Sequence, residues 1–131
     1  MKTYEIKLDT GRSIETARIE INRRESRLSF LRESGFRKIY TDHDLFLCLA
    51  KIRKEFSEIK FLCKGAKLNV FPSRMCSQMG RGMVAYELTM EKSATFDDIV
   101  HIFDYEESNI SKTPKEQNEF YINWLKSLTP K

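Results

Sequence analysis

The last part of the chain carries the pattern that most restricts its possible folds. Thr113, Pro114 and Glu116 form a capping box with proline at the first helical position, where its missing N–H costs nothing. Large apolar side chains then recur at every fourth position: Phe120, Trp124 and Leu128. The pattern predicts a helix over residues 113–128 whose aromatic face packs on the rest of the chain.

A second helix is predicted over about residues 42–56. Thr41 and Asp44 have the spacing of another capping box, in which the threonine caps the helix and the acid bonds back to it. Apolar side chains follow with helical spacing at Leu45, Leu49, Ile52 and Phe56. We therefore expect one face of this helix to be buried.

Most of the remaining chain alternates apolar with polar residues, which is typical of strands. The expected strands lie near 4–8 and 14–21 as a hairpin, near 36–40, near 59–63 and 68–71 as a second hairpin turning at Gly65, near 84–88, and within 97–104. Residues 23–34 are ambiguous, because Leu28 and Leu31 fit a helix whereas Leu28 and Phe30 fit a strand. We favour a short helix there, and a loop or a single helical turn over residues 74–82.

Together these elements predict an α+β fold. The 131 residues have the usual length of one domain, and a hydrophobic content of 40% supplies a real core. We expect a single α+β domain over residues 1–131. Its largely antiparallel sheet should be packed on one side by the helices near 42–56 and 113–128.

Cysteine spacing and hydropathy argue against a disulfide-rich, zinc-binding or membrane-spanning protein. Cys48, Cys63 and Cys76 are odd in number and too far apart for a Cys-x-x-Cys pair, which argues against a disulfide framework or a zinc site. No run reaches the ~20 apolar residues that a membrane helix needs, and the start of the chain does not resemble a signal peptide. We expect a cytoplasmic protein with no membrane partner.

The sequence contains no recognisable catalytic constellation. A nucleophilic enzyme needs a histidine base beside serine or cysteine, and the only histidines, His43 and His101, lie among acids instead. Gly80 and Gly82 lack the strand-turn-helix context of a dinucleotide fingerprint, and no phosphate-binding loop occurs. We predict a binding protein with no catalytic residue, no metal and no cofactor. A small enzyme whose site no motif reveals is the remaining alternative.

Charge differs between the two parts of the chain. Through Gly80 there are 17 basic and 10 acidic residues, a balance of +7, and from Arg81 onward 6 and 9, a balance of −3. The basic part contains Arg18, Arg23, Arg24, Arg27, Arg32, Arg37 and Lys38. Such a set could contact phosphates, so a nucleic-acid-binding or regulatory protein is the alternative function. Glutamates interrupt the set, as on a solvated surface, and nucleic acid is not the expected partner.

Two segments are candidates for contact with a protein partner. The first is irregular and combines flexible side chains with glycines; its candidates are Met75, Gln78, Met79 and Arg81. The second is acidic and carries an aromatic residue; its candidates are Asp97, Asp98, Asp104, Tyr105, Glu106 and Glu107. Carboxylates speed encounter with a basic partner, and an aromatic side chain supplies buried area. The structural alternatives are a tucked loop that fills the core and a solvated linker.

Three stretches, Phe61 to Met75, Gln78 to Leu88 and Glu116 to Leu125, resemble a family of small bacterial proteins. Some members look like the immunity proteins of contact-dependent growth inhibition and related polymorphic toxin systems. The resemblance implies a cytosolic inhibitor that binds a cognate toxin domain, often a nuclease, and blocks its active site or substrate surface. Many nuclease inhibitors are acidic, whereas this chain has a net charge of +4 and only its second half has the expected sign.

Overall fold

The computed structural model describes residues 2–129, apart from the side chain of Met79. Its strands are β1 (Lys2–Asp9), β2 (Ile14–Asn22), β3 (Arg27–Leu31), β4 (Arg37–Thr41), β5 (Lys60–Leu62), β6 (Val70–Phe71), β7 (Val84–Glu87) and β8 (Ile99–His101). Its helices are α1 (Leu45–Glu55), α2 (Arg74–Gly80) and α3 (Pro114–Ser127), with short 3-10 helices η1 (Lys64–Ala66) and η2 (Phe96–Asp98). The predicted α+β fold is confirmed.

The strands form two antiparallel sheets. The larger sheet has the order β4-β3-β2-β1-β5, and the smaller has the order β6-β7-β8. The predicted N-terminal hairpin is confirmed: β1 pairs with β2 along the whole of β1, and Gly11 turns the chain between them with a φ of +87°. Because side chains alternate along a strand, Ile6 and Leu8 enter the core while Glu5 and Lys7 face solvent.

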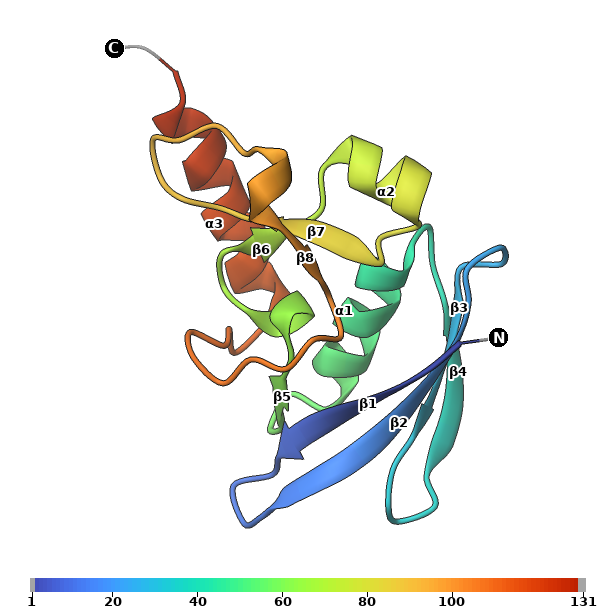
Figure 1. Ribbon diagram of the computed structural model, residues 1–131. Coiled ribbons are helices and arrows are strands. Elements are labelled where there is room, and N and C mark those ends of the chain that lie inside the picture. Colours follow the sequence, from blue (N-terminus) through green and yellow to red (C-terminus); the bar gives the residue numbers. More distant parts are fainter. Residues whose placement is uncertain (1, 130–131) are drawn as a thin grey trace.

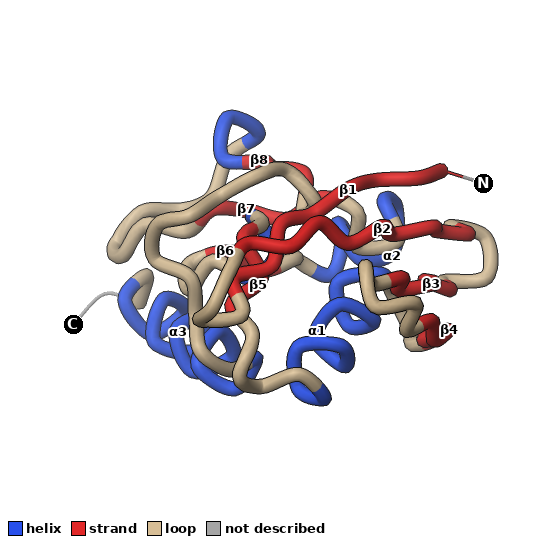
Figure 2. Tube along the Cα trace, turned by 90° about the horizontal axis from the view of Figure 1, so that it is seen from below, coloured by secondary structure: helices blue, strands red, loops and turns tan. Residues whose placement is uncertain are grey.

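The two longer helices, α1 and α3, lie on one side of the sheets. Seen from below, α1 and α3 lie side by side, and β1 and β8 lie on the opposite side of the molecule (Figure 2). α1 packs on β3 and β4, and α3 packs on β6 and α1 (Figure 1). One cluster of buried apolar residues runs from the larger sheet through α1 to the smaller sheet, so a continuous core joins the two sheets.

The start of α3 agrees with its predicted capping box. Thr113 Oγ1 accepts from the N–H of Glu116 at 3.3 Å, and the N–H of Thr113 donates to Glu116 Oε1 at 3.1 Å. The predicted cap of α1 is wrong by three residues. Thr41 ends β4, so the helix begins later, and Asp44 caps it by accepting from the N–H of Leu47 at 2.8 Å.

The expected helix within residues 23–34 is wrong, because this part of the chain forms β3. Leu28 and Phe30 are both buried and lie opposite core residues of β2. Ser26, with a φ of +50°, turns the chain tightly after β2. The alternation of Leu28 and Phe30, rather than the spacing of Leu28 and Leu31, therefore decides the structure.

The expected hairpin over residues 59–71 is also wrong. β5 pairs with β1 and β6 pairs with β7, so the two strands belong to different sheets. Gly65 lies between them in η1, where its N–H donates to the carbonyl oxygen of Ile102 at 2.8 Å. A Cβ at this position would lie 2.6 Å from Leu49 Cδ2, so the glycine permits close packing instead of closing a hairpin.

Residues 74–82, for which a loop or single turn is predicted, contain the two-turn helix α2. Ser73 caps this helix by accepting from the N–H of Cys76 at 3.1 Å. Arg81 ends it in the left-handed region with a φ of +54°. The Oγ of Ser77 donates to Asp44 Oδ2 at 2.5 Å, so α2 is fixed against the start of α1.

Candidate functional site

The thiols of Cys48 and Cys63 and the imidazole of His101 pack against neighbouring residues of the fold. Cys48 and Cys63 are buried, and burial raises the pKa of their thiols to about 12 and about 11. His101 packs its ring 5.0 Å from that of Tyr4, and its Nδ1 accepts from the N–H of Phe103 at 3.3 Å. Burial lowers the pKa of His101, so this imidazole is predominantly neutral at pH 7.

The structure divides the predicted contact residues between two places. Met75, Gln78 and Arg81 lie on or just after α2, and Asp97 and Asp98 lie in η2. Asp104, Tyr105, Glu106 and Glu107 lie in the segment after β8, beside the end of β5 (Figure 1). The side chain of Met79 lies outside the described part of the chain. α2 and η2 border one hollow, and of the predicted contact residues only Met75 lines it. Gln78, Arg81, Asp97 and Asp98 lie on or next to the elements that border it, and the other four described candidates lie at a second place.

A shallow apolar hollow of about 290 Å³ joins α2, β7 and η2. Its lining consists of Met75, Cys76, Gly80, Val84, Tyr86, Phe96 and Ile99. Phe96 is 80% exposed, more than any other large apolar side chain in the described residues, and Met75 is 51% exposed. Exposed apolar groups that cluster around a hollow are characteristic of contact surfaces rather than of solvated faces.

Phe96 is held at the surface by a short capped turn. The N–H of Thr95 donates to Asp98 Oδ2 at 2.9 Å, and the N–H of Asp98 donates to the carbonyl oxygen of Thr95 at 2.9 Å. Asp98 therefore serves mainly as a cap, whereas Asp97 is exposed beside Phe96. Phe96 is absent from the sequence-based prediction. The available signal was the Thr95-x-x-Asp98 spacing, which marks a helical start with Phe96 in its first turn.

The acidic candidates of both places, Asp97 and Asp98 at one and Asp104, Glu106 and Glu107 at the other, belong to one acidic segment, defined as residues 93–111. It contains five carboxylates and no lysine or arginine. Asp104 and Glu107 are exposed, and Tyr105 is 57% exposed. The hydroxyl of Tyr105 donates to Glu107 Oε2 at 2.9 Å, which raises the pKa of Tyr105 and holds its ring outward. The acidic segment thus carries two exposed aromatic rings, Phe96 and Tyr105, with carboxylates beside each.

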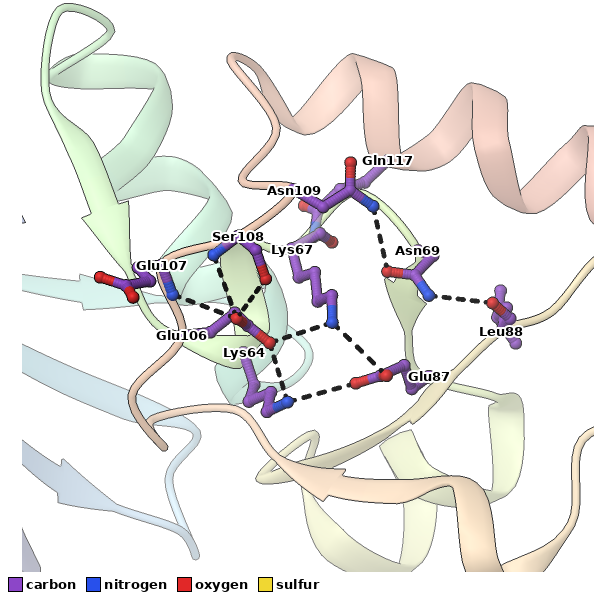
Figure 3. Close-up of polar contacts among 10 residues, drawn as sticks. All are labelled: Lys64, Lys67, Asn69, Glu87, Leu88, Glu106, Glu107, Ser108, Asn109 and Gln117. Carbon is purple, nitrogen blue, oxygen red and sulfur yellow. Dashed lines mark hydrogen bonds and ion pairs between the residues drawn. The ribbon is translucent and has the colours of Figure 1, made fainter.

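Glu106 differs from its neighbours because it is tied into an ion-pair cluster (Figure 3). Its Oε1 pairs with Lys64 Nζ at 2.9 Å and with Lys67 Nζ at 3.0 Å, while its Oε2 accepts from Ser108 Oγ at 2.8 Å. Both lysines also pair with Glu87, at 3.3 and 3.4 Å. These donors hold the pKa of Glu106 well below its usual range.

The ion-pair cluster gives Glu106 a positioning role. Its lysine partners lie in and just after η1, so the carboxylate fixes the segment after β8 against η1. The same lysines pair with Glu87, which links this segment indirectly to β7. A further link is the Nδ2 of Asn109, which donates to Asn69 Oδ1 at 3.5 Å (Figure 3). Because charge-assisted bonds of this kind are strong when partly buried, the neighbouring Tyr105 and Glu107 are presented in a fixed geometry.

The arginine-rich set does not form one basic face. Arg32 makes a bidentate pair with Glu15 at 3.0 and 2.7 Å, and its guanidinium lies 5.3 Å from the ring of Phe56. The side chain of Lys38 lies on the face of the sheet that α1 covers, and its Nζ pairs with Glu55 Oε1 at 2.8 Å. On the outer face of the larger sheet, Arg18, Arg27 and Arg37 alternate with Glu5 and Glu20. Mixed charge of this kind favours a solvated surface over a phosphate-binding one.

No protein-family model matches the chain, and no curated protein sequence matches it. None of the helices within residues 2–129 is long and apolar enough to cross a lipid bilayer.

Proposed function

We propose that this chain is a cytoplasmic, non-enzymatic binding protein, and most specifically an immunity protein that neutralises a cognate bacterial toxin domain. The observation that carries the proposal is the acidic segment. It combines the most exposed large apolar side chain of the described residues, Phe96, with five carboxylates and no lysine or arginine. The resemblance of three other stretches, Phe61 to Met75, Gln78 to Leu88 and Glu116 to Leu125, to immunity proteins supplies the biological setting.

The segment favours a partner with a basic surface. Exposed carboxylates at Asp97, Asp104 and Glu107 raise the rate of encounter with a positively charged protein. Phe96 and Tyr105 then supply anchors, since each large aromatic side chain offers roughly 150–250 Å² for burial. Anchors of this type, surrounded by polar groups, carry most of the free energy of protein association.

The geometry of the segment also reduces the cost of binding. The Thr95–Asp98 capping box holds Phe96, and the Glu106 ion pairs hold Tyr105. Groups that are already ordered lose less conformational freedom when a partner binds. Pre-organisation is therefore expected to slow dissociation of the complex more than it changes the rate of association.

A rescue experiment in the bacterium that encodes the chain tests the proposal. The tagged chain is used to capture partners through a high-salt wash, and each captured protein is then expressed alone and with the chain. We expect one partner to arrest growth by itself and to be neutralised by co-expression. Phe96→Ser should abolish the rescue, whereas Ile39→Ser, which alters an exposed apolar residue on β4, should retain it.

Two outcomes would contradict the proposal. One is equal rescue by the Phe96 variant and the Ile39 variant, which would remove the acidic segment from the interface. The other is capture of nucleic acid that salt releases, with no toxic protein partner. That result would favour the arginine-rich set and the alternative function.

A further inference from the structure

A second concave site lies beside the hollow, between α2, β7 and α3. We call it the aromatic groove; its volume is about 430 Å³, within the usual range of small-molecule sites. Its walls are Phe71, Tyr86, Tyr121 and Trp124, with leucines at its edges. The groove shares Met75 and Tyr86 with the hollow, but Phe96 and the carboxylates of η2 are not part of its lining.

Three of the rings form a continuous stack. The rings of Phe71 and Tyr121 lie 4.3 Å apart with planes inclined by 14°, and those of Tyr121 and Trp124 lie 6.0 Å apart with planes inclined by 25°. Near-parallel rings present flat apolar faces and edges to a ligand. A planar aromatic group can extend such a stack, whereas a bulky aliphatic group gains area only.

Hydrogen bonds to α3 order the part of the chain that borders the groove. Trp124 Nε1 donates to the carbonyl oxygens of Thr89 and Lys92, both at 3.0 Å, and the N–H of Glu91 donates to Ser127 Oγ at 2.9 Å. These bonds hold the connection between β7 and η2 against α3. The site therefore requires no rearrangement of this connection before a ligand enters.

The only charge in the lining of the groove is positive. Arg74 is the only charged residue of the lining; it is exposed and forms no ion pair with the described residues. The hydroxyls of Tyr86, Tyr121 and Ser93 likewise make no hydrogen bond within the described part of the chain. An apolar cavity with one free guanidinium and three hydroxyls is complementary to a ligand with a flat apolar body and an anionic end.

We propose that the aromatic groove binds a small aromatic carboxylate, with its ring against Tyr121 and Trp124 and its carboxylate toward Arg74. Ligand binding in the aromatic groove does not depend on protein binding at Phe96. An experiment can therefore contradict one of these two proposals and leave the other standing.

A matched series of probes tests the assignment. 4-Phenylbutanoate, 4-phenylbutanol and 4-phenylbutylamine share one ring and differ in the charge of one end. Trp124 is the only tryptophan in the chain and lines the groove, so its fluorescence reports occupancy directly. We expect saturable changes with affinity in the order carboxylate, alcohol, amine, the carboxylate binding about fivefold more tightly than the alcohol.

Variants separate the ring contacts from the charge. Arg74→Ala should abolish the roughly fivefold preference for the carboxylate while leaving alcohol binding unchanged, and Arg24→Ala, at an exposed arginine between β2 and β3, should change neither. Ala94→Leu fills the groove from its rim and should weaken all three probes. Absence of any saturable signal at millimolar concentration, equal binding of the three probes, or an unchanged carboxylate preference in the Arg74 variant would each overturn the proposal.

Discussion

Replacement of Gln117 by alanine tests the polar network that joins α1, η1 and α3. Gln117 is 1% exposed, and its Oε1 accepts from Arg53 Nη1 at 2.6 Å. Its Nε2 donates to the carbonyl oxygens of Gly65 and Lys67 at 2.9 and 2.8 Å. Arg53 is itself only 4% exposed, and its other acceptors are the carbonyl and hydroxyl oxygens of Ser111.

The expected loss follows from these contacts. A hydrogen bond to a charged group contributes about 1.5–3 kcal/mol, and each carbonyl left without its donor in the interior costs on the order of 1 kcal/mol. Gln117→Ala should therefore lower the free energy of unfolding by about 3–5 kcal/mol, a large part of the 5–15 kcal/mol typical of a domain. Arg53 would remain buried with a weaker set of acceptors.

Urea unfolding followed by Trp124 fluorescence and circular dichroism measures this loss. The matched control is Asn118→Ala, at an exposed neighbour on the same helix, and it should change stability by less than about 0.5 kcal/mol. Combining Gln117→Ala with Arg53→Met should cost less than the sum of the two single changes, because the buried charge is gone. A loss below about 1 kcal/mol for Gln117→Ala, or strict additivity in the double variant, would contradict a stabilising role for this polar network.

Two further predictions concern the packing and the ion pairs. Gly65→Ala places a Cβ 2.6 Å from Leu49 Cδ2 and 3.1 Å from the backbone oxygen of Ile102, so it should destabilise the fold by about 1–3 kcal/mol in urea unfolding; an unchanged midpoint would contradict the close packing. The lowered pKa of Glu106 contributes stability that is present above the ordinary carboxyl pKa of 4.5 and is lost as pH falls below it. Glu106→Gln should therefore flatten the loss of stability between pH 5 and pH 2, whereas Glu119→Gln, at an exposed position on α3, should retain the parent profile.

Local sequence signals predicted the elements whose determinants lie within a few residues of one another. The Thr113–Glu116 capping box and the alternation in β1 and β2 are of this kind, and both are confirmed. The pairing of β5 with β1 and of β6 with β7, instead of with each other, was not predictable in the same way. It depends on Gly65 fitting beneath Ile102, a contact between residues far apart in the sequence.

In the candidate site, too, local sequence signals predicted some residues and missed those that depend on distant contacts. Tyr105 and Glu107 are exposed, so the acidic character of the segment was a usable guide. Glu106 is held by Lys64, a partner some forty residues earlier, and no local pattern distinguishes it from Glu107. Phe96 was missed because exposure of an apolar side chain is decided by what the fold leaves uncovered.

Photo-crosslinking in living cells tests whether the surface around Phe96 contacts a protein partner. A photoreactive amino acid is placed at Phe96 in one variant and at Ile39, on the far side of the larger sheet from α1, in another, and the covalent products are identified by mass spectrometry. We expect one dominant adduct with a single protein from position 96 and none from position 39. Absence of an adduct at position 96, or adducts with protein or nucleic acid only from position 39, would contradict this contact.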